Sequence, residues 1–368
     1  MRYLQIQVKG YKSLANVTLD LHPLTVMIGP NGCGKTSLLE VFRVLAEAAQ
    51  QRLEKAITDL GGLEAVLTHT LQAETKLEIA FTVDHATSQF QGLQTYRCVL
   101  QPRPVGYTVS EDNWDLGNEH LGMPRYVGPK PITELRQILS LWNSGSISRL
   151  DDIPLTGTAY YSFLNVGARA PVRLPQALTP ATQPGVDGET LLSALYNLRE
   201  AKLSQSIYKR IEETLRLAFP SFEGLKLRVV GAGQITLEWH EKGLTVPLYS
   251  SQLSEGTLRF LWLTTVLLSS EPPTLILIDE PEVSLHPELQ KILAALLQDA
   301  SARTQIIVAT HSPELIRWLQ ADEVVVIDKV DGESKFTWAS DSSLDLEAWL
   351  RDFTLADLWY MGNLGGRP

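Results

Sequence analysis

The sequence predicts an α/β fold with a mixed β-sheet at its core, and three observations lead to this prediction. The apolar run 24–28 ends at a glycine-rich turn that leads into the helix-forming run 37–49. The aliphatic runs 274–278 and 305–310 have the composition of strands buried on both faces, as in a parallel sheet. Residues 77–110 instead alternate apolar and polar side chains, as antiparallel strands with one solvated face do.

The glycine-rich turn has the G-x-x-x-x-G-K-[ST] form of a phosphate-binding loop. Glycines let successive backbone N–H groups point inward at a phosphate without a Cβ clash. The helix that follows directs its unpaired N–H groups and its positive dipole end at the same place. We therefore expect a bound ATP, with Lys35 reaching the β and γ oxygens. The predicted nucleotide-binding residues of this turn are Gly29, Pro30, Asn31, Gly32, Cys33, Gly34, Lys35, Thr36 and Ser37.

Two acidic residues end the aliphatic strand at 274–278. Asp279 is expected to hold Mg²⁺ through water, and Glu280, which faces the other way, is expected to polarise an attacking water. Pro281 ends the strand at this point because it cannot donate to a sheet ladder. Beside an intact phosphate loop, these acids predict ATP hydrolysis, with Thr36 and Asp279 as metal ligands and with Glu280 and Lys35 as catalytic residues.

Two further segments flank the acidic strand along the chain. Leu-Ser-Glu-Gly-Thr at 253–257 precedes the apolar helical run 258–268, and Ser254 and Gly256 suit a helix N-terminus that approaches a γ-phosphate. Taken alone, the segment is better explained by ordinary helix capping, but its position shortly before the acidic strand favours the phosphate contact. His311 follows a strand directly and should therefore lie at the ligand-binding edge of a doubly wound sheet.

In their order along the chain, the phosphate loop, the segment 253–257, the acidic strand and His311 resemble the motifs of ABC-class ATPases of the SMC, RecF and OLD-like branch. The resemblance covers residues 1–60 and 187–330, and it extends to the S-L-H-P form of the D-loop at 284–287. It implies a P-loop NTPase of the ABC-head type that forms a homodimer. Ser254 and Gly256 of one head would close over the ATP of the other, and His311 would sense the γ-phosphate.

The N-terminal turn at 10–13 also resembles this branch, in which the turn lies beside the nucleotide base. Tyr11 and Lys12 are therefore either base contacts or residues of an ordinary exposed turn. The glutamine loop, which supplies a Mg²⁺ ligand in the family, has no clear counterpart. Three glutamines are available, and each is better explained as a surface residue: Gln50, Gln51 and Gln72.

The chain also lacks the sustained heptads of a coiled coil. Only residues 312–368 follow His311, too few for the TOPRIM nuclease domain of OLD proteins. The resemblance therefore implies an ATPase that works with a separate effector, such as a TOPRIM-type nuclease, in DNA maintenance or antiviral defence. Two alternatives are the nucleotide-binding subunit of a transporter, which an adjacent permease gene would favour, and a slow ATP-sensing scaffold, which very low turnover would favour.

Composition favours a cytoplasmic protein. Two cysteines, Cys33 and Cys98, form no disulfide framework, and no apolar run approaches the ~20 residues that span a bilayer. The formal net charge of −10 argues against a surface that is positive overall, although a local patch could still contact DNA. At helical spacing one basic stripe forms a face that is either solvated or DNA-binding, with a solvated face the simpler explanation: Arg199, Lys202, Lys209, Arg210 and Arg216.

The motif positions predict three parts. These are an N-terminal ATPase lobe at 1–92, a β-rich and irregular insertion at 93–187, and a C-terminal lobe at 188–368. Within them we expect a helix near 131–142, a strand near 158–166, helices at 188–218 and strands at 225–240. The apolar tail 358–366 either packs back onto the head or docks a partner.

Overall fold

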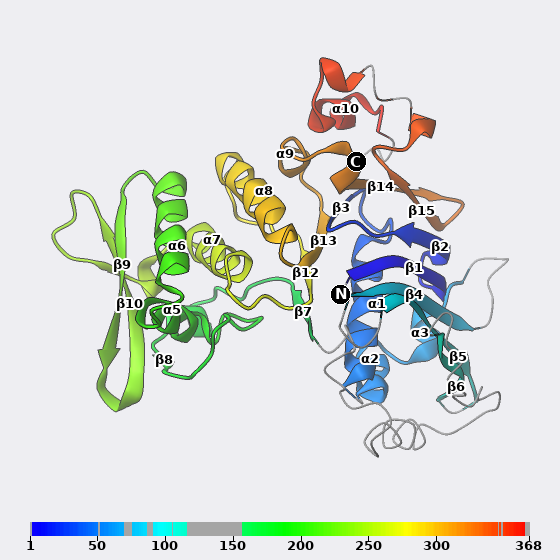
Figure 1. The fold of residues 1–368 in the computed structure, drawn as a ribbon, viewed down its shortest axis with the longest axis horizontal. Coiled ribbons are helices and arrows are strands. Elements are labelled where there is room, and N and C mark those ends of the chain that lie inside the picture. The colour runs from blue at the N-terminus through cyan, green and yellow to red at the C-terminus, as the bar shows by residue number, and fades with distance from the viewer. Residues whose placement is uncertain are drawn as a thin grey trace. The chain divides into compact units, whose positions relative to one another are not determined.

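The computed structural model describes residues 2–50, 52–69, 76–86, 91–104, 106–115, 157–344, 346 and 349–364 (Figure 1). By its internal contacts the chain forms two compact units. Unit 1 comprises residues 1–158 and 320–368, and unit 2 comprises residues 159–319. The three-part division by motif content, 1–92, 93–187 and 188–368, stays a prediction beside this division by contacts.

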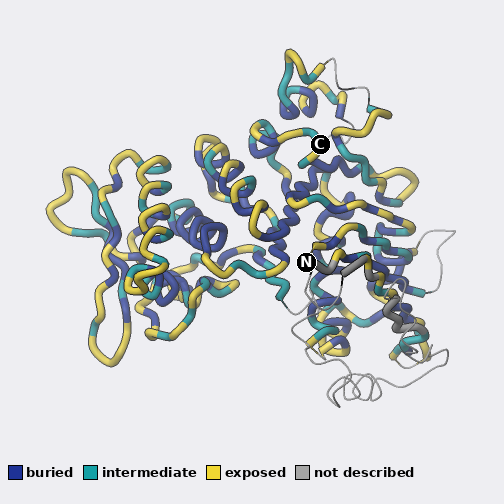
Figure 2. The backbone as a smooth tube through the Cα atoms, in the orientation of Figure 1, coloured by how far each residue is buried: buried dark blue, intermediate teal, exposed yellow. Residues whose placement is uncertain are grey.

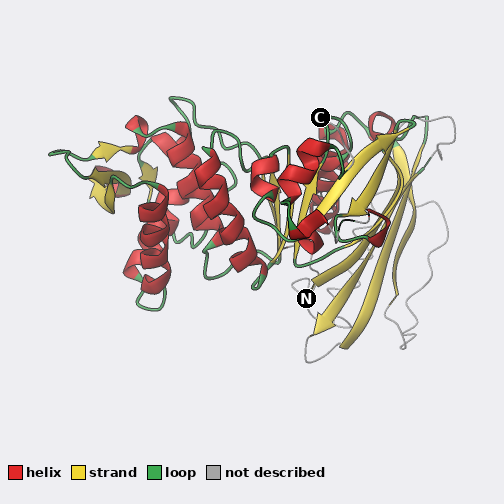
Figure 3. Cartoon of the chain, turned by 90° about the horizontal axis from the view of Figure 1, so that it is seen from above, coloured by secondary structure: helices red, strands yellow, loops and turns green. Residues whose placement is uncertain are grey.

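Unit 1 contains a five-stranded antiparallel sheet in the order β2-β1-β4-β5-β6, whose strands run side by side in Figure 3. Along β1, Tyr3, Ile6 and Val8 are buried, and the polar residues between them are more exposed, as one-sided packing requires. This confirms the antiparallel strands expected within 77–110. The strands are β1 (Arg2–Tyr11), β2 (Leu14–Asp20), β4 (Leu77–Ala86), β5 (Gln91–Pro102) and β6 (Tyr107–Asp115).

A second group of strands in unit 1 carries the phosphate loop. β3 (Leu24–Ile28) is buried along its whole length and pairs in parallel with β14 (Val324–Val330), which pairs antiparallel with β15 (Glu333–Trp338). The unit's helices are α1 (Lys35–Ala49), α2 (Leu53–Asp59), α3 (Leu63–Val66) and α10 (Leu355–Met361). The glycine-rich turn therefore joins a buried strand to a long helix, as expected.

Unit 2 places the acidic strand beside the strand that precedes His311. β12 (Leu275–Asp279) and β13 (Gln305–Thr310) pair in parallel, with Asp279 opposite Ala309, and α8 (Pro287–Ser301) connects them. Because the strands are parallel and in register, their carboxyl ends bring the acids and His311 to one edge. A short helix, α9 (Pro313–Ile316), follows His311.

The remainder of unit 2 is a small antiparallel sheet with helices. The strands of this sheet are β8 (Gln176–Ala177), β9 (Phe222–Val230), β10 (Gln234–Glu241) and β11 (Leu248–Tyr249), whereas β7 (Thr158–Tyr161) lies beside β12. The helices are α5 (Leu191–Glu200), α6 (Gln205–Ala218) and α7 (Glu255–Leu267). All residues of α7 from Leu258 to Leu267 are buried, so this helix is a core element and appears dark blue in Figure 2.

One prediction is wrong. The helices expected at 188–218 are present as α5 and α6, but residues 201–204 separate them, so the basic stripe, which we expected at the spacing of a single helix, does not lie along one helix. Three of its members already contact acidic side chains: Arg199 with Glu200, Arg210 with Asp299, and Arg216 with Glu212. The stripe is therefore partly neutralised.

Other expectations are refined. The strand expected near 158–166 spans only Thr158–Tyr161, and the helix expected near 131–142 lies outside the described residues. In the tail, Leu358 and Trp359 are buried within unit 1, which favours packing onto the head, although Tyr360 is exposed. Gln50 directly follows α1, whereas Gln51 and Gln72 lie outside the described residues. Among the helices that the structure describes, none is long and apolar enough to cross a membrane.

Candidate nucleotide site

The phosphate loop turns tightly between Ile28, the last residue of β3, and Lys35, the first of α1. Gly34 caps α1 with φ of 112°, a conformation that side chains rarely adopt. A Cβ at Gly34 would lie 2.4 Å from Ser334 Oγ, so the position disfavours any side chain for two separate reasons. The loop is thus shaped by close packing as well as by its own sequence.

Lys35 is buried, and its ammonium group holds the loop together. Its Nζ donates to the carbonyl oxygens of Gly29 at 2.7 Å and Pro30 at 3.0 Å, and it lies 3.8 Å from Cys33 Sγ. Burial raises the pKa of the Cys33 thiol, an effect that the Lys35 charge partly opposes. Cys33 is therefore a thiol at neutral pH, and the Lys35 ammonium supplies the positive charge within the loop.

A serine far along the chain supports the loop from below. Ser334, on β15, donates from its Oγ to the carbonyl oxygen of Cys33 at 2.6 Å, and the same Oγ lies 2.8 Å from Ser13 Oγ. The Ser334 backbone N–H also donates to the carbonyl oxygen of Ser13 at 2.8 Å. Motif reading did not identify Ser334, because nothing in the sequence indicates that β15 reaches the loop.

The N-terminal turn is attached to α1 through one carboxylate. Tyr11 is buried and its hydroxyl donates to Glu40 Oε2 at 2.9 Å, while Lys12 Nζ lies 2.5 Å from the same oxygen. Burial and the Glu40 charge both raise the pKa of Tyr11. The turn is therefore not an ordinary exposed one, and both predicted base-contact candidates are engaged with Glu40.

In unit 2 the structure brings Glu280 and His311 together. Glu280 Oε1 lies 3.6 Å from His311 Nε2, and both side chains are partly exposed. Glu280 has φ of 50°, and its N–H donates to the carbonyl oxygen of Ala309 at 2.8 Å. Such left-handed backbone at a non-glycine residue is concentrated at functional sites. Asp279, the last residue of β12, accepts from the Tyr160 hydroxyl at 3.3 Å.

The segment 253–257, called the signature-like segment below, packs against the D-loop at 284–287. Ser254 caps α7 as expected for a residue at a helix N-terminus, because its Oγ accepts from the Thr257 N–H at 3.1 Å. A Cβ at Gly256 would lie 2.4 Å from the carbonyl oxygen of Ser284, and Ser284 Oγ donates to Glu255 Oε1 at 2.8 Å. Gly256 is thus required for close backbone approach within this unit.

Two charged residues near this edge were not identified from the sequence. Glu282 accepts from the His311 N–H at 2.7 Å, and burial, together with repulsion from Glu280, raises the pKa of its carboxyl group. Arg259 is buried in α7, where its Nε lies 3.6 Å from Glu255 Oε1 and its guanidinium carbon lies 4.5 Å from the centroid of the Phe163 ring. A lone arginine in the apolar run 258–268 was a signal that could have identified it.

The predicted site residues therefore divide between the two units, with one group in unit 1 and two groups in unit 2. The phosphate loop with Lys35, Thr36 and Ser37 belongs to unit 1. Asp279, Glu280 and His311 gather at one strand edge of unit 2. The segment 253–257, with Ser254 and Gly256, also belongs to unit 2.

Two families of ATPase domains match parts of the chain. Residues 172–317 match the family described as "AAA domain, putative AbiEii toxin, Type IV TA system", and residues 1–113 match "AAA ATPase domain". The chain is 24% identical over 361 residues to the OLD nuclease of Thermus scotoductus, covering 90% of this chain. It spans 65% of the length of that relative.

Among solved structures, the chain is similar to the Smc head bound to the C-winged helix domain of ScpA. The TM-score is 0.59 at 15% identity, covering 94% of this chain and 100% of the other. An Smc head with an extended coiled coil, bound to the C-terminal domain of ScpA derived from Pyrococcus furiosus, has a TM-score of 0.59 at 13% identity and covers 95% and 99%. The chain therefore has the fold of the Smc ATPase heads, a P-loop NTPase fold of the ABC type, and its sequence is similar to ATPase domains and to the OLD nuclease.

Proposed function

We propose that this chain is an Mg²⁺-dependent ATP hydrolase that closes into a homodimer around ATP and acts on a separate effector. The observation that carries the proposal is the phosphate loop, in which the buried Lys35 ammonium lies among the loop carbonyls at the N-terminus of α1. A positive charge and a helix N-terminus converging on one turn form a polyphosphate site. We assign nucleotide binding to Gly29–Ser37, with Lys35 exchanging its carbonyl contacts for phosphate oxygens.

The donor set fits a magnesium ion. Thr36 offers a hydroxyl and Asp279 a carboxylate, and hard oxygen ligands of this kind suit Mg²⁺. When bound, the ion would neutralise the charge that develops on the phosphate oxygens. The Tyr160 hydroxyl donates to Asp279 Oδ2 at 3.3 Å and so contributes to orienting the carboxylate.

We assign the orientation of the attacking water to Glu280, whose side chain is half-exposed and therefore reachable by solvent. His311, 3.6 Å away, would support the γ-phosphate and hold the Glu280 carboxylate in place. Ser254 and Gly256 at the N-terminus of α7 would close over the ATP of the second head. ATP thereby joins the two subunits, and its hydrolysis releases them.

The biological setting is DNA maintenance or antiphage defence, with an effector such as a TOPRIM-type nuclease supplied by another chain. This part of the proposal draws on the relatives: one is an OLD nuclease, and the similar Smc heads are bound to ScpA domains. We place the protein in the cytoplasm for the same reason.

The test compares Glu280→Gln with Lys35→Ala. Glu280→Gln retains the shape of the side chain but removes the carboxylate that orients water, so ATP turnover should fall by roughly 10²- to 10⁴-fold while ATP binding persists. Light scattering should then show an accumulated dimer with ATP and Mg²⁺, whereas Lys35→Ala should lose ATP binding. An unchanged mass for Glu280→Gln with and without nucleotide, in the absence of a preformed dimer, would refute the shared site.

A mixing experiment tests the same sharing independently. Ser254→Arg should leave a competent phosphate loop in a chain that cannot close over its neighbour's ATP, and Lys35→Ala should retain a competent signature-like segment at 253–257. A mixed dimer of these two inactive chains contains one intact composite site. Partial recovery of ATPase activity on mixing is expected from a shared site, whereas complete inactivity would mean either that the site is not shared or that both sites must act together.

A further inference from the structure

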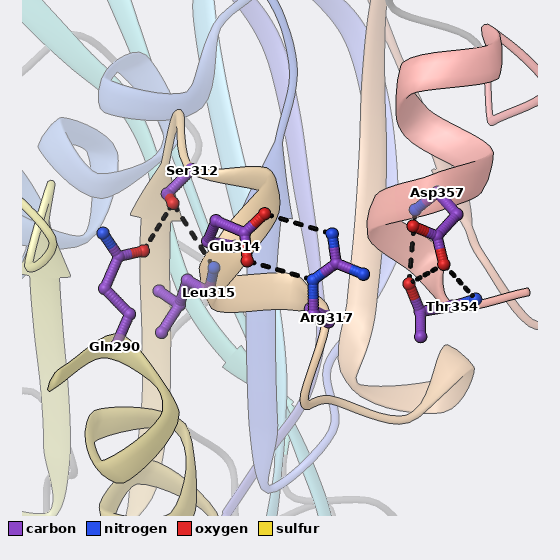
Figure 4. A network of polar contacts seen from close by, with 7 residues as sticks. All are labelled: Gln290, Ser312, Glu314, Leu315, Arg317, Thr354 and Asp357. Atoms are coloured by element: carbon purple, nitrogen blue, oxygen red, sulfur yellow. Dashed lines mark hydrogen bonds and ion pairs between the residues drawn. The ribbon is translucent and has the colours of Figure 1, made fainter. Parts of the chain in front are cut away.

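The turn that carries His311 is held by two side chains from the segment that follows the acidic strand. The His311 N–H donates to Glu282 Oε1 at 2.7 Å. The Ser312 hydroxyl donates to Oε1 of Gln290, on α8, at 2.5 Å, a contact visible in Figure 4. Consecutive residues of one turn are therefore attached to two points on one neighbouring segment.

These two attachment points are themselves connected. The Gln290 side-chain amide donates to the carbonyl oxygen of Leu285 at 3.3 Å, and the Leu285 N–H donates to the carbonyl oxygen of Glu282 at 2.9 Å. Gln290 is buried, so water competes little for its hydrogen bonds. Glu282, Leu285 and Gln290 thus form one hydrogen-bonded support beneath His311 and Ser312.

The support is also restrained on its other side. Ser284 lies within it, and its carbonyl oxygen is in close contact with Gly256 while its hydroxyl donates to Glu255 at 2.8 Å. Because Gly256 and Glu255 lie at the start of the buried helix α7, the segment 282–285 has little freedom to shift. A support that is itself rigid can set the position of the turn above it.

From these contacts we propose that Glu282 is the positioning residue of His311, with Gln290 as the second attachment of the same turn. The assignment rests on the proposed function, since it matters only if His311 takes part in hydrolysis. Glu282 needs only one acceptor oxygen for this role. Its Oε2 is buried and has no hydrogen-bond partner among the described residues.

The chemistry of Glu282 supplies a matched pair of variants. Because burial raises the pKa of this carboxyl group, its protonated form is favoured more than usual, and a neutral amide resembles that form. Glu282→Gln retains an acceptor for the His311 N–H, whereas Glu282→Ala removes it. Gln290→Met removes the second attachment while it retains the length of the buried side chain.

The experiment measures single-turnover ATP hydrolysis and ATP affinity for these variants, each in the wild-type and in the His311→Ala background. In the wild-type background Glu282→Ala should slow hydrolysis by about 10- to 100-fold, the usual cost of misplacing a group at the reaction centre, with ATP affinity unchanged. Gln290→Met should have a smaller effect in the same direction. Glu282→Gln should stay within about twofold of wild type, since it keeps the hydrogen bond.

The His311→Ala background separates positioning from a merely structural role. Once the imidazole is gone, Glu282→Ala should slow hydrolysis no further, because residues that act as one unit are not additive. The proposal is overturned if Glu282→Ala slows ATP hydrolysis equally in both backgrounds. It is also overturned if Glu282→Ala slows hydrolysis in neither background although His311→Ala itself is impaired. If His311→Ala itself hydrolyses ATP normally, the role of His311 in the proposed function is refuted and the positioning role with it. If Glu282→Ala fails to fold, the same comparison is made with Gln290→Met.

Discussion

Replacing Gly34 by alanine tests whether the phosphate loop is shaped by the contact with Ser334. An alanine at φ of 112° costs about 1–2 kcal/mol in backbone strain. Its Cβ would also lie 2.4 Å from Ser334 Oγ, and moving that hydroxyl away breaks its 2.6 Å hydrogen bond to the Cys33 carbonyl. Leaving these buried groups unpaired costs about 1–3 kcal/mol. The total loss of unfolding free energy should therefore be roughly 2–5 kcal/mol.

Gly32 provides the matched control in the same loop. It also has positive φ, 72°, but a Cβ there meets no atom within 4 Å. Gly32→Ala should therefore cost only the backbone term of about 1–2 kcal/mol. Urea denaturation followed by circular dichroism measures both losses, and the difference between the variants isolates the contact.

Ser334→Ala completes the comparison as a double-mutant cycle. In a Ser334→Ala chain the nearest obstructing atom is absent, so the added cost of Gly34→Ala should fall towards that of Gly32→Ala, with a remainder from Ser13 Oγ at 3.0 Å and Leu14 Cδ2 at 3.1 Å. Equal losses for the two glycine variants in the wild-type chain would refute the reasoning. So would a Gly34→Ala cost that does not change when Ser334 is truncated.

Two further predictions concern charge. Because the pKa of the Glu282 carboxyl group is raised in the folded state, the folded chain binds a proton there more tightly than the unfolded chain does. The free energy of unfolding therefore falls as the pH rises from the ordinary carboxyl pKa near 4.5 through the raised pKa of Glu282. Glu282→Gln should therefore raise the thermal midpoint at pH 8 and lose this advantage as pH falls towards 4.5; an advantage independent of pH would contradict the assignment. Any DNA binding through the basic stripe should be sensitive to salt and weakened by charge reversal at Lys209 and Arg210. Tight filter binding that survives both reversals would show that the stripe is irrelevant.

The local parts of the site could be predicted because their chemistry is written in consecutive residues. The strands at 24–28 and 305–310 have the predicted bounds, and the phosphate loop joins strand to helix as its motif requires. Glu280 and His311 were expected at strand ends, and the parallel pairing of β12 with β13 brings them within 3.6 Å. A strand-end position needs only the strand pattern to be recognised.

The basic stripe shows where a periodic pattern misleads. Its spacing fits a helix, but the chain leaves the helix at 201–204, a stretch with neither glycine nor proline to mark the break. Tertiary contacts decide such breaks, because α5 and α6 each turn an apolar face to the core: Leu195 and Leu198 are buried on α5, and Ile211 and Leu215 on α6. Propensity alone does not encode that arrangement.

The sequence by itself determined the class of fold, the phosphate loop and the residues that end the two buried strands. Only the tertiary structure decided what supports them. Ser334 supports Cys33 across 301 positions of the chain, Glu282 reaches His311 across 29, and Gln290 reaches Ser312 across 22. Each is an ordinary polar residue in its own segment and is significant only through its partner. A motif records residues that are close along the chain, whereas hydrogen bonds between distant residues exist only once the chain has folded.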